Sequence, residues 1–307
     1  MEYPLVTVFT LIYNTNPRYV IEAIESVRDN NYPNIQHIII DDCSPDTIPK
    51  ETVKGWIEKE KYPCEFYEHK VNFGICKTLN HVLELAKGKY ILPCGDDLLH
   101  RDMMSSLISV LEDQNLDVIF SRTNVYENGG FKYIFPAEEH IVNFEKIKNN
   151  YESLLIKNIL PAIGTIYKTE ILRKIGGYDE DLKYEDLDMH IRLIQNNYKY
   201  FFHLNSYSDY FIRSTGFSKS HSYLISRQKV LVKYKHFQTF NFAYRQWLKS
   251  VFFQDFQLVK FVDFSEHPNL IFRFFFKYFC TEKSGDLIFK ILAKENKFTL
   301  KLYKFIK

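Results

Sequence analysis

Short apolar segments rich in β-branched residues alternate with amphipathic segments in the first part of the chain, and this alternation restricts the fold more than any other feature. The apolar segments are 5–12, 35–42, 64–69, 89–94 and 116–120, and the segments with helical spacing are 17–30, 52–60, 75–88 and 103–114. Strands that alternate with helices form βαβ units, whose strands lie parallel in one sheet. We therefore predict an α/β fold with a Rossmann-like, mostly parallel sheet and helices on both faces.

Two helix ends carry local sequence signals. Asn16 followed by Pro17 is typical of an N-cap and a first helical residue. Gly88 follows the helical segment 75–88 at its end, and we predict that it is the C-cap.

Beyond the fifth apolar segment the pattern changes. Asn-Gly-Gly at 128–130 predicts a hairpin turn, and 159–197 predicts a strand, a short helix, a Gly-Gly turn and a helix from about Glu185. From residue 226 the chain is aromatic, basic and largely helical in pattern. We expect two domains, 1–225 and 226–307.

Pairs of acids follow two of the predicted strands: Asp41-Asp42 and Asp96-Asp97. In parallel sheets, ligands bind outside the carboxyl ends of the strands, so both pairs are expected at one ligand-binding edge. Adjacent carboxylates repel each other unless a cation or a polar ligand sits with them. The alternative is that Asp41 or Asp97 only caps the next helix.

Cysteine content and the N-terminal sequence indicate the compartment. The five cysteines are an odd number without C-x-x-C spacing, which argues against a disulfide framework or a zinc site and for a reducing environment. The N-terminal segment lacks a basic region and a cleavage site, so we expect no signal peptide. No uncharged apolar run reaches the ~20 residues of a membrane span.

Four ordered segments carry a resemblance to a known family. They are VTVFTLIYN, IIIDDCSPD, NFGICKTLNHVLELAKGKYILPCGDD and IGGYDEDLKYEDLDMHIRL. Their order and spacing over about 1–222 resemble family 2 glycosyltransferases, which have the GT-A fold, use nucleotide sugars and invert the anomeric centre. Each segment alone is a weak signal, and the four together are specific.

The resemblance implies a divalent cation at the second acid pair. Asp97 would be the metal ligand, and Asp96 would contact the ribose or a metal-bound water. Mn²⁺ or Mg²⁺ suits oxygen ligands, and one or two protein carboxylates suffice when waters and phosphates complete the shell. The cation would neutralise charge that grows on the departing diphosphate. Many relatives have an acid at the position of Cys94, which we interpret as a packing residue.

Further donor contacts follow from the same resemblance. Asp42 would accept a hydrogen bond from the nucleobase of the donor, which we expect to be a UDP-sugar. Arg213 would face the pyrophosphate. Gly74 allows close backbone approach, and Lys77 can pair with phosphate or reach the base. The remaining expected contacts are Asn72 on the same loop, Thr10 and Leu11 near the end of the first strand, and Tyr13 directly after it. Leu11 departs from the family pattern, so contacts there are expected from backbone groups and Tyr13.

The resemblance places the catalytic base at Asp186, with Glu185 contacting an acceptor hydroxyl. Direct displacement needs a base on the face opposite the leaving pyrophosphate. The alternative is that both acids merely favour a helix N-terminus, and that Asp188 and Arg192 form an ordinary i,i+4 ion pair.

The segment 211–220 departs from the family at one position. Thr215 stands where relatives carry a histidine that contacts metal or phosphate, while Arg213 and Ser218 match the pattern. His221 is a nearby substitute metal or phosphate contact. Six other histidines show no ligand spacing and are interpreted as structural: His37, His69, His81, His100, His140 and His190.

The charge distribution separates the two predicted domains. Residues 226–307 contain 16 Lys and Arg against 6 Asp and Glu, whereas 1–225 contain 24 against 32. Segments 269–280 and 287–307 place Lys among Phe, Leu and Ile at helical spacing, as in helices that lie in a membrane interface. The alternative is an ordinary helical subdomain with Lys on its solvated face. Nucleic-acid binding is not expected, because the aromatic residues follow helical spacing and no RNA-binding motif is present.

The function predicted from the sequence is a glycosyltransferase that adds a sugar, from UDP-sugar as the expected donor, to a glycan or polyprenyl-linked glycan acceptor. Such an enzyme would act in capsule, O-antigen or similar polysaccharide synthesis, in the cytoplasm and peripherally on the inner face of the membrane. Two alternatives stay open. A sugar nucleotidyltransferase would need a Gly-rich, basic loop after the first strand, and YNTNPRY is not one. A non-catalytic glycan-binding or scaffold protein could keep the same fold.

Overall fold

The computed structural model of this chain divides into two compact units. It describes residues 3–141, 144–147, 149–213, 221–254, 262, 263 and 265. The first unit comprises Met1–Tyr151 with Asn158–Ser214, and the second comprises Glu152–Lys157 with Thr215–Lys307. The domain boundary near 225 stays a prediction.

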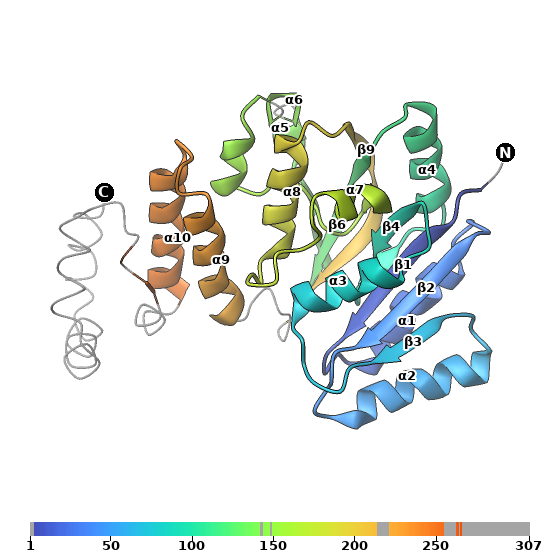
Figure 1. Ribbon diagram of the computed structural model, residues 1–307. Coiled ribbons are helices and arrows are strands. Elements are labelled where there is room, and N and C mark those ends of the chain that lie inside the picture. The colour runs from blue at the N-terminus through green and yellow to red at the C-terminus, as the bar shows by residue number, and fades with distance from the viewer. Residues whose placement is uncertain are drawn as a thin grey trace, which may run out of the picture. The chain divides into compact units, whose positions relative to one another are not determined.

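A nine-stranded sheet forms the first unit (Figure 1). Its strands are β1 (Val6–Ile12), β2 (Ile35–Asp41), β3 (Glu65–Glu68), β4 (Tyr90–Pro93), β5 (Leu98–Leu99), β6 (Val118–Glu127), β7 (Gly130–Phe135), β8 (Thr165–Lys168) and β9 (Tyr200–Ile212). The order is β3-β2-β1-β4-β8-β6-β9-β5, with β7 beside β6. Strands β1 to β4 pair in parallel, and β6 pairs in parallel with β9. The predicted α/β fold is confirmed, and β5, β7 and β8 add antiparallel pairs to it.

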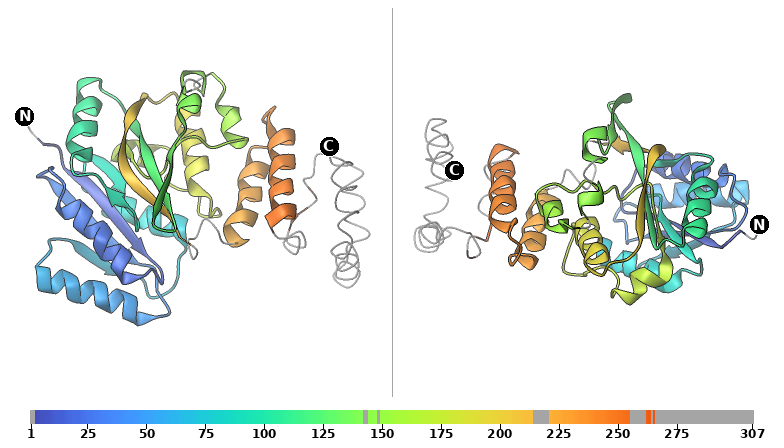
Figure 2. Two further views of the ribbon diagram at one scale, coloured as in Figure 1. Left: turned by 180° about the vertical axis from the view of Figure 1, so that it is seen from behind. Right: turned by 90° about the horizontal axis from the view of Figure 1, so that it is seen from above.

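Helices cover both faces of the sheet. The helices of this unit are α1 (Pro17–Arg28), α2 (Thr47–Glu60), α3 (Ile75–Leu85), α4 (Met103–Asp113), the short α5 (Glu138–Ile141) and α6 (Phe144–Ile147), α7 (Thr169–Lys174) and α8 (Glu185–Gln195). A 3₁₀ turn (Tyr151–Leu155) follows α6 in the chain. Helix α3 lies in front of the sheet in Figure 1, and α1 lies in front in the opposite view of Figure 2. Apolar residues of α1 and α4 share one core with β1 and β4.

Local signals explain where two helices start. The Asn16 side chain accepts a hydrogen bond from the backbone nitrogen of Arg18 at 3.0 Å, and Pro17 is the first helical residue, as predicted. Helix α2 starts five residues earlier than predicted, because Asp46 caps it by accepting from the nitrogen of Ile48 at 3.0 Å.

The predicted C-cap at Gly88 is wrong. Helix α3 ends at Leu85 and is capped by Ala86. A Cβ atom at residue 88 would lie 2.4 Å from the backbone nitrogen of Thr7. Glycine is therefore required there because the chain crosses close to β1 as it enters β4.

The sheet curls back on itself. Strands β4 and β5 stand fourth and eighth in the order, yet only residues 94–97 join them. Such a short connection spans at most about 17 Å. The strands between them must therefore curve, and the carboxyl end of β9 comes to lie beside the turn that carries Asp96 and Asp97.

The second unit contains α9 (His221–Lys233) and α10 (Phe240–Gln254). Trp247 is buried between them and donates a hydrogen bond from Nε1 to the carbonyl oxygen of Leu224 at 2.8 Å. Segments 269–280 and 287–307, on which the membrane prediction depends, lie outside the described residues. Within the described part of the chain, no helix combines the length and the hydropathy needed to cross a bilayer.

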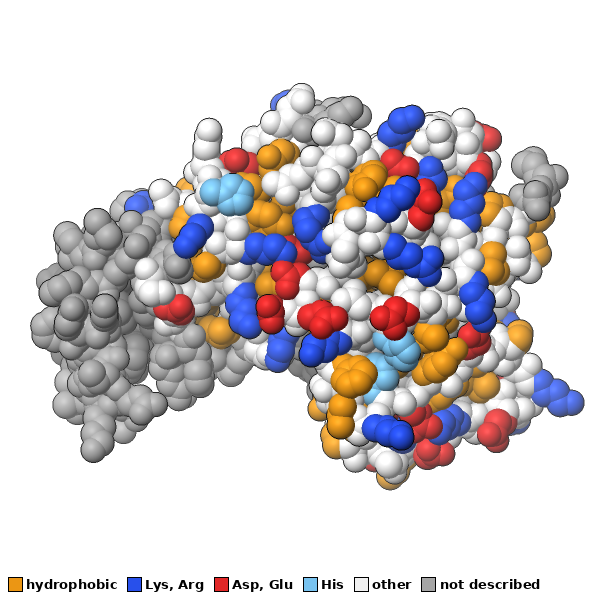
Figure 3. Space-filling model, viewed as in Figure 1, with side chains coloured by type: hydrophobic (Ala, Val, Ile, Leu, Met, Phe, Trp, Pro, Cys, Tyr) orange, Lys and Arg blue, Asp and Glu red, His pale blue; other side chains and the backbone are white. Residues whose placement is uncertain are grey.

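Charged side chains of both signs are interspersed over the face shown in Figure 3. The described residues on that face do not form the continuous basic surface that is typical of nucleic-acid-binding domains.

Candidate active site

The turn between β4 and β5 holds the Asp96-Asp97 pair. Gly95 has φ 66°, a conformation that favours glycine, and it turns the chain after β4. The backbone nitrogen of Phe211 in β9 donates to Oδ1 of Asp97 at 2.9 Å. Asp97 is 5% exposed, and burial followed by the charge of Asp96 raises the pKa of Asp97 well above its usual value. This carboxyl group is held out of water beside a like charge.

Arg213 lies on the other acid of the pair. Its Nε donates to Oδ2 of Asp96 at 2.7 Å, and its Nη2 donates to the Asp96 carbonyl oxygen at 2.6 Å. Its guanidinium carbon lies 3.6 Å from the ring centre of Tyr19 in α1. The sequence predicted that Arg213 faces a pyrophosphate, and here its donors bind the carboxylate and the carbonyl oxygen of Asp96.

The acid pair fits a divalent cation of the predicted kind. Among the described residues no group of three His, Cys, Asp or Glu side chains could hold a metal by itself. Mg²⁺ and Mn²⁺ need only one or two protein carboxylates when phosphate and water supply the other oxygens. Burial and the charge of Asp96 raise the pKa of Asp97, and a bound cation would offset both effects by stabilising the ionised carboxylate. Asp97 and Asp96 are therefore the residues that would hold it.

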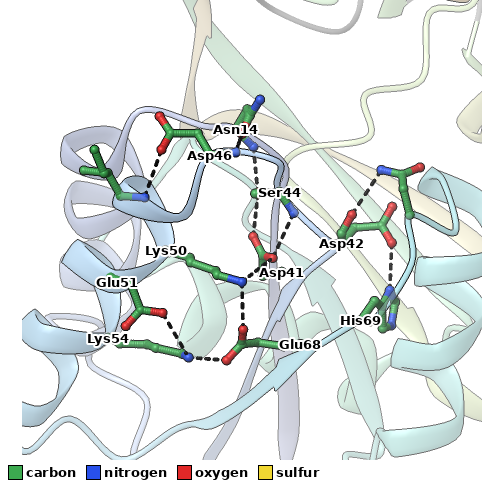
Figure 4. Close-up of polar contacts among 12 residues, drawn as sticks. Asn14, Asp41, Asp42, Ser44, Asp46, Lys50, Glu51, Lys54, Glu68 and His69 are labelled. Atoms are coloured by element: carbon green, nitrogen blue, oxygen red, sulfur yellow. Dashed lines mark hydrogen bonds and ion pairs between the residues drawn. The ribbon is translucent and has the colours of Figure 1, made fainter.

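Asp42, after β2, organises the predicted nucleobase loop (Figure 4). Its Oδ1 accepts from the backbone nitrogen of Phe73 at 2.8 Å, and its Oδ2 accepts from that of Gly74 at 2.8 Å. Asn72 donates from Nδ2 to the Asp42 carbonyl oxygen at 3.0 Å. Gly74 has φ 78°, which allows the loop to wrap around the carboxylate before α3 starts. The structure thus brings Asp42, Asn72 and Gly74 together, and their contact with a nucleotide sugar stays a prediction.

Two histidines that the sequence analysis left as structural extend from Asp42. His69 Nδ1 lies 2.7 Å from Oδ1 of Asp42, and His69 Nε2 lies 2.9 Å from Nδ1 of His81 in α3. The two rings stack with centroids 5.1 Å apart. An ionised carboxylate only accepts, so His69 carries its proton on Nδ1 toward Asp42. The position of His69 directly after β3 was the signal that could have placed it at this edge.

Asp41 has a structural role instead. It is fully buried and accepts from Ser44 at 3.0 Å through the backbone nitrogen and at 2.5 Å through the hydroxyl. Lys50 lies 3.8 Å from it and also pairs with Glu68 (Figure 4). Asp41 closes the turn after β2, while the cap of α2 is Asp46.

The other predicted donor contacts differ in exposure. Thr10 is fully buried, and its hydroxyl lies 3.1 Å from Nε2 of His37, so only backbone groups are left at this position. Leu11 is partly exposed, Lys77 is exposed, and Tyr13 is 53% exposed. Thr215 and Ser218 lie outside the described residues, and the side chain of His221 is not described either.

The predicted base stands in the first turn of α8. Oδ2 of Asp186 accepts from Nδ2 of Asn158 at 3.2 Å. Removal of Glu185 from water, together with the charge of Asp186, raises the pKa of Glu185 to about 8. Glu185 therefore largely carries a proton near neutral pH.

The raised pKa of Glu185 predicts a pH-dependent stability. The folded protein binds a proton that the unfolded chain releases near pH 4.5, so the free energy of unfolding falls as pH rises from about 4.5 to about 8. We expect Glu185→Gln to flatten this decline in urea titrations at pH 5 and pH 8. Glu84→Gln, at an exposed position, should leave it unchanged. An unaltered pH dependence in Glu185→Gln would contradict the assignment.

The start of α8 is fixed through a glycine turn. Arg192 pairs with Asp188 at 2.8 Å, as the alternative interpretation expected. It also donates to the carbonyl oxygens of Ile175 at 2.9 Å and Gly177 at 2.7 Å. The ion pair therefore does more than stabilise a helix, because it ties α8 to the turn that precedes it.

Asn80 of α3 holds the same turn, and the sequence analysis missed it. Its Oδ1 accepts from the nitrogen of Tyr178 at 2.7 Å, and its Nδ2 donates to the Tyr178 carbonyl oxygen at 2.9 Å. A side chain at Gly177 would lie 2.5 Å from Oδ1 of Asn80. Asn80 thus sets the distance between the nucleobase loop, which leads into α3, and the turn that leads to Asp186.

Replacement of Asn80 by alanine should destabilise the fold. The change leaves two polar backbone groups of Tyr178 without this partner, which costs about 1–3 kcal/mol when such groups stay out of water. Urea denaturation measures the loss, and Asn205→Ala, at an exposed position, is the control. Equal stability of both variants would show that the turn does not depend on Asn80.

Comparisons with known proteins identify the family of the chain. The profile described as "Glycosyl transferase family 2" matches residues 7–176. An uncharacterised glycosyltransferase of Methanocaldococcus jannaschii is 30% identical over 206 residues, which cover 65% of this chain and 68% of the relative. WcaA of Escherichia coli, whose name refers to colanic acid biosynthesis, is 30% identical over 135 residues, or 44% of this chain and 47% of WcaA. A Rickettsia typhi relative is matched over 62% of its length.

Solved structures share the fold. The Staphylococcus aureus TarS fragment 1-349 in complex with UDP-GlcNAc has a TM-score of 0.59 at 17% identity, covering 87% of this chain and 77% of that chain. The mannosyltransferase PcManGT of Pyrobaculum calidifontis, in complex with GDP-Man and Mn²⁺, has a TM-score of 0.53 at 18% identity, covering 76% and 63%. The predicted GT-A fold is therefore confirmed, and the profile covers more than half of the chain. The chain belongs to glycosyl transferase family 2.

Proposed function

We propose that this chain transfers one sugar, with inversion, from a UDP-sugar to a hydroxyl group of a glycan or polyprenyl-linked glycan. The observation that carries the proposal is the placement of two acidic sites at one sheet edge. Asp42 follows β2 and Asp97 follows β4, and β1 alone lies between these strands. Two strand spacings of about 4.8 Å separate them, so a nucleoside diphosphate can lie across the edge with its base at Asp42 and its phosphates at Asp97.

The acceptor character of Asp42 supports the choice of base. Its carboxylate already accepts hydrogen bonds from the N–H groups of Phe73, Gly74 and His69. A base with a ring N–H, such as uracil, adds one more donor, whereas cytosine and adenine would present a ring acceptor and repel it. TarS was solved with UDP-GlcNAc and PcManGT with GDP-Man, and both bases carry a ring N–H.

The remaining residues have distinct proposed roles. A divalent cation held by Asp97 and Asp96 would neutralise charge on the leaving diphosphate. When donor binds, Arg213 releases Asp96 and its guanidinium binds the diphosphate, whose oxygens accept its hydrogen bonds. Asp186 takes the proton of the acceptor hydroxyl as that oxygen bonds to the anomeric carbon, and the sugar–phosphate bond breaks on the opposite face.

Glu185 has a separate proposed role beside the base. It carries a proton below about pH 8 and can hydrogen-bond the acceptor. Its neutral form also limits repulsion of the ionised Asp186.

The proposed setting is surface-polysaccharide synthesis, such as capsule or O-antigen, at the inner face of the cytoplasmic membrane. The relationship to WcaA supports this setting. The excess of Lys and Arg in 226–307 supports contact with an anionic membrane surface that presents polyprenyl-linked acceptors.

Calorimetry with the full chain tests the nucleotide site. We expect UDP to bind in the presence of Mn²⁺ and at least tenfold more weakly in EDTA, because the diphosphate then meets the acid pair without a cation. CDP and ADP are control ligands that keep the diphosphate and change the base. Turnover of UDP-sugars that releases UDP supports a transferase, while formation of UTP and the sugar 1-phosphate when pyrophosphate is added would indicate a nucleotidyltransferase. Absence of nucleotide binding would favour the scaffold alternative and overturn the proposal.

A further inference from the structure

One face of the β6–β9 ribbon is left open to solvent beside the acid pair. In the parallel register, Asn124 lies opposite Asp209 and Tyr126 lies opposite Phe211. These four side chains are partly exposed, whereas the neighbouring Val125 is buried on the other face. Along β6, residues 122–126 alternate between partly exposed and buried, while residues 209–212 of β9 are all partly exposed. Polar and aromatic pairs therefore follow one another toward the carboxyl end of the ribbon.

Aromatic rings on this open face form a row. Tyr126 and Phe211 stack with centroids 5.3 Å apart and an interplanar angle of 23°. Phe131, across the hairpin in β7, packs edge-on against Tyr126 at 5.9 Å. Phe131 is 58% exposed, so one end of the row is available to a ligand. We call Tyr126, Phe131 and Phe211 the aromatic row.

The other end of the row adjoins the proposed donor site. The backbone nitrogen of Phe211 holds Asp97, and the Arg213 guanidinium carbon lies 5.0 Å from the Phe211 ring centre. Arg213 in turn holds Asp96. A ligand on the aromatic row would therefore approach the place where the diphosphate and its sugar are expected to bind.

We propose that the aromatic row is the subsite for the acceptor glycan. This inference rests on the proposed function and names the ligand class of its second substrate. A pyranose ring has an apolar face of C–H groups that stacks on aromatic rings, and a rim of hydroxyls that needs polar partners. Asp209, which accepts from Asn124 at 2.8 Å and lies 2.9 Å from His100 Nε2, supplies such a polar cluster beside the rings.

The alternative occupant is a second copy of the chain, paired through β7. Strand β7 bonds to β6 on one side and stands off the main order of the sheet. Lys132 is exposed on it and pairs with Glu127 at 2.5 Å. A charged lysine on an edge strand opposes strand pairing between molecules. Pairing of a second copy through β7 is therefore disfavoured, and a glycan is the favoured occupant of the open face.

The test uses the full chain with UDP and Mn²⁺ on an array of immobilised pyranose oligosaccharides of two to six sugars. We expect Phe131→Ala to weaken binding of the best oligosaccharide about tenfold, as loss of a stacking ring does. Phe131→Tyr keeps the ring and should bind like the unaltered chain. Phe201→Ala, an exposed aromatic at the far end of β9, is the control.

Calorimetry of UDP and the rate of UDP-sugar hydrolysis without acceptor separate this inference from the proposed function. Both should be unchanged in Phe131→Ala, and their absence in the unaltered chain would contradict the proposed function itself. The acceptor subsite is overturned if no array oligosaccharide binds the unaltered chain, or if Phe131→Ala binds the best oligosaccharide as tightly as the unaltered chain. It is also overturned if light scattering shows that Phe131→Ala changes the oligomeric state.

Discussion

Replacement of Asp97 by asparagine is expected to abolish sugar transfer and, at the same time, to stabilise the metal-free chain. The proposed cation depends on this carboxylate, and electrostatic stabilisation by a metal contributes several kcal/mol to such reactions. Each ~1.4 kcal/mol is a factor of ten in rate, so kcat should fall by about 10³-fold or more. UDP binding in the presence of Mn²⁺ should weaken in parallel.

The gain in stability follows from the pKa of Asp97. Burial and the charge of Asp96 raise that pKa well above 3.8, so the folded protein binds a proton that the unfolded chain gives up. The free energy of unfolding therefore falls as pH rises from about 3.8 through the raised value. Asparagine has the same shape without the charge, and it removes this decline.

Thermal unfolding in EDTA at pH 5 and pH 8 checks the second effect, and turnover of UDP-sugar with Mn²⁺ checks the first. Asp113→Asn, an equal change of charge at the exposed end of α4, should alter neither. Normal transfer by Asp97→Asn would show that the cation is held elsewhere.

Asp186→Asn is expected to lower kcat by about 10²–10⁴-fold, the usual contribution of a general base. The change keeps the shape of the side chain and its contact with Asn158, so the fold and UDP binding should persist. Kinetics at saturating donor give kcat, and calorimetry gives the UDP dissociation constant. Asp181→Asn, an exposed acid four residues after Gly177, is the charge-matched control.

A comparison with Glu185→Gln makes the assignment of the base specific. Loss of activity in that variant together with normal transfer in Asp186→Asn would reverse the two roles. Loss of UDP binding in Asp186→Asn would instead place Asp186 in the donor site.

Local patterns predicted the elements on which the site stands. The buried strands β1 and β2, the cap at Asn16 and the hairpin at 128–130 depend on residues close in sequence, and the structure reproduces them. Gly88 was misinterpreted because its restriction comes from Thr7, a residue far away along the chain. No residue pattern within 75–88 indicates the contact between Gly88 and Thr7.

The contacts of two histidines were not predicted for the same reason. His69 and His81 are twelve residues apart, on a strand end and a helix, and they meet only because the loop between them folds around Asp42. Asn80 likewise contacts Tyr178, ninety-eight residues away. Such contacts have no sequence period that a pattern can detect.

The sequence by itself determined the α/β order of elements, the family resemblance and the acids at the carboxyl ends of strands, because hydrophobic period and strand polarity are local properties. Only the tertiary structure decided that Arg213 lies on Asp96, that Phe211 holds Asp97, and that an open aromatic face runs on from them. Those contacts require the curl that brings β9 beside the turn after β4. Curvature of a sheet comes from the pairing and packing of all its strands together, and no single segment encodes it.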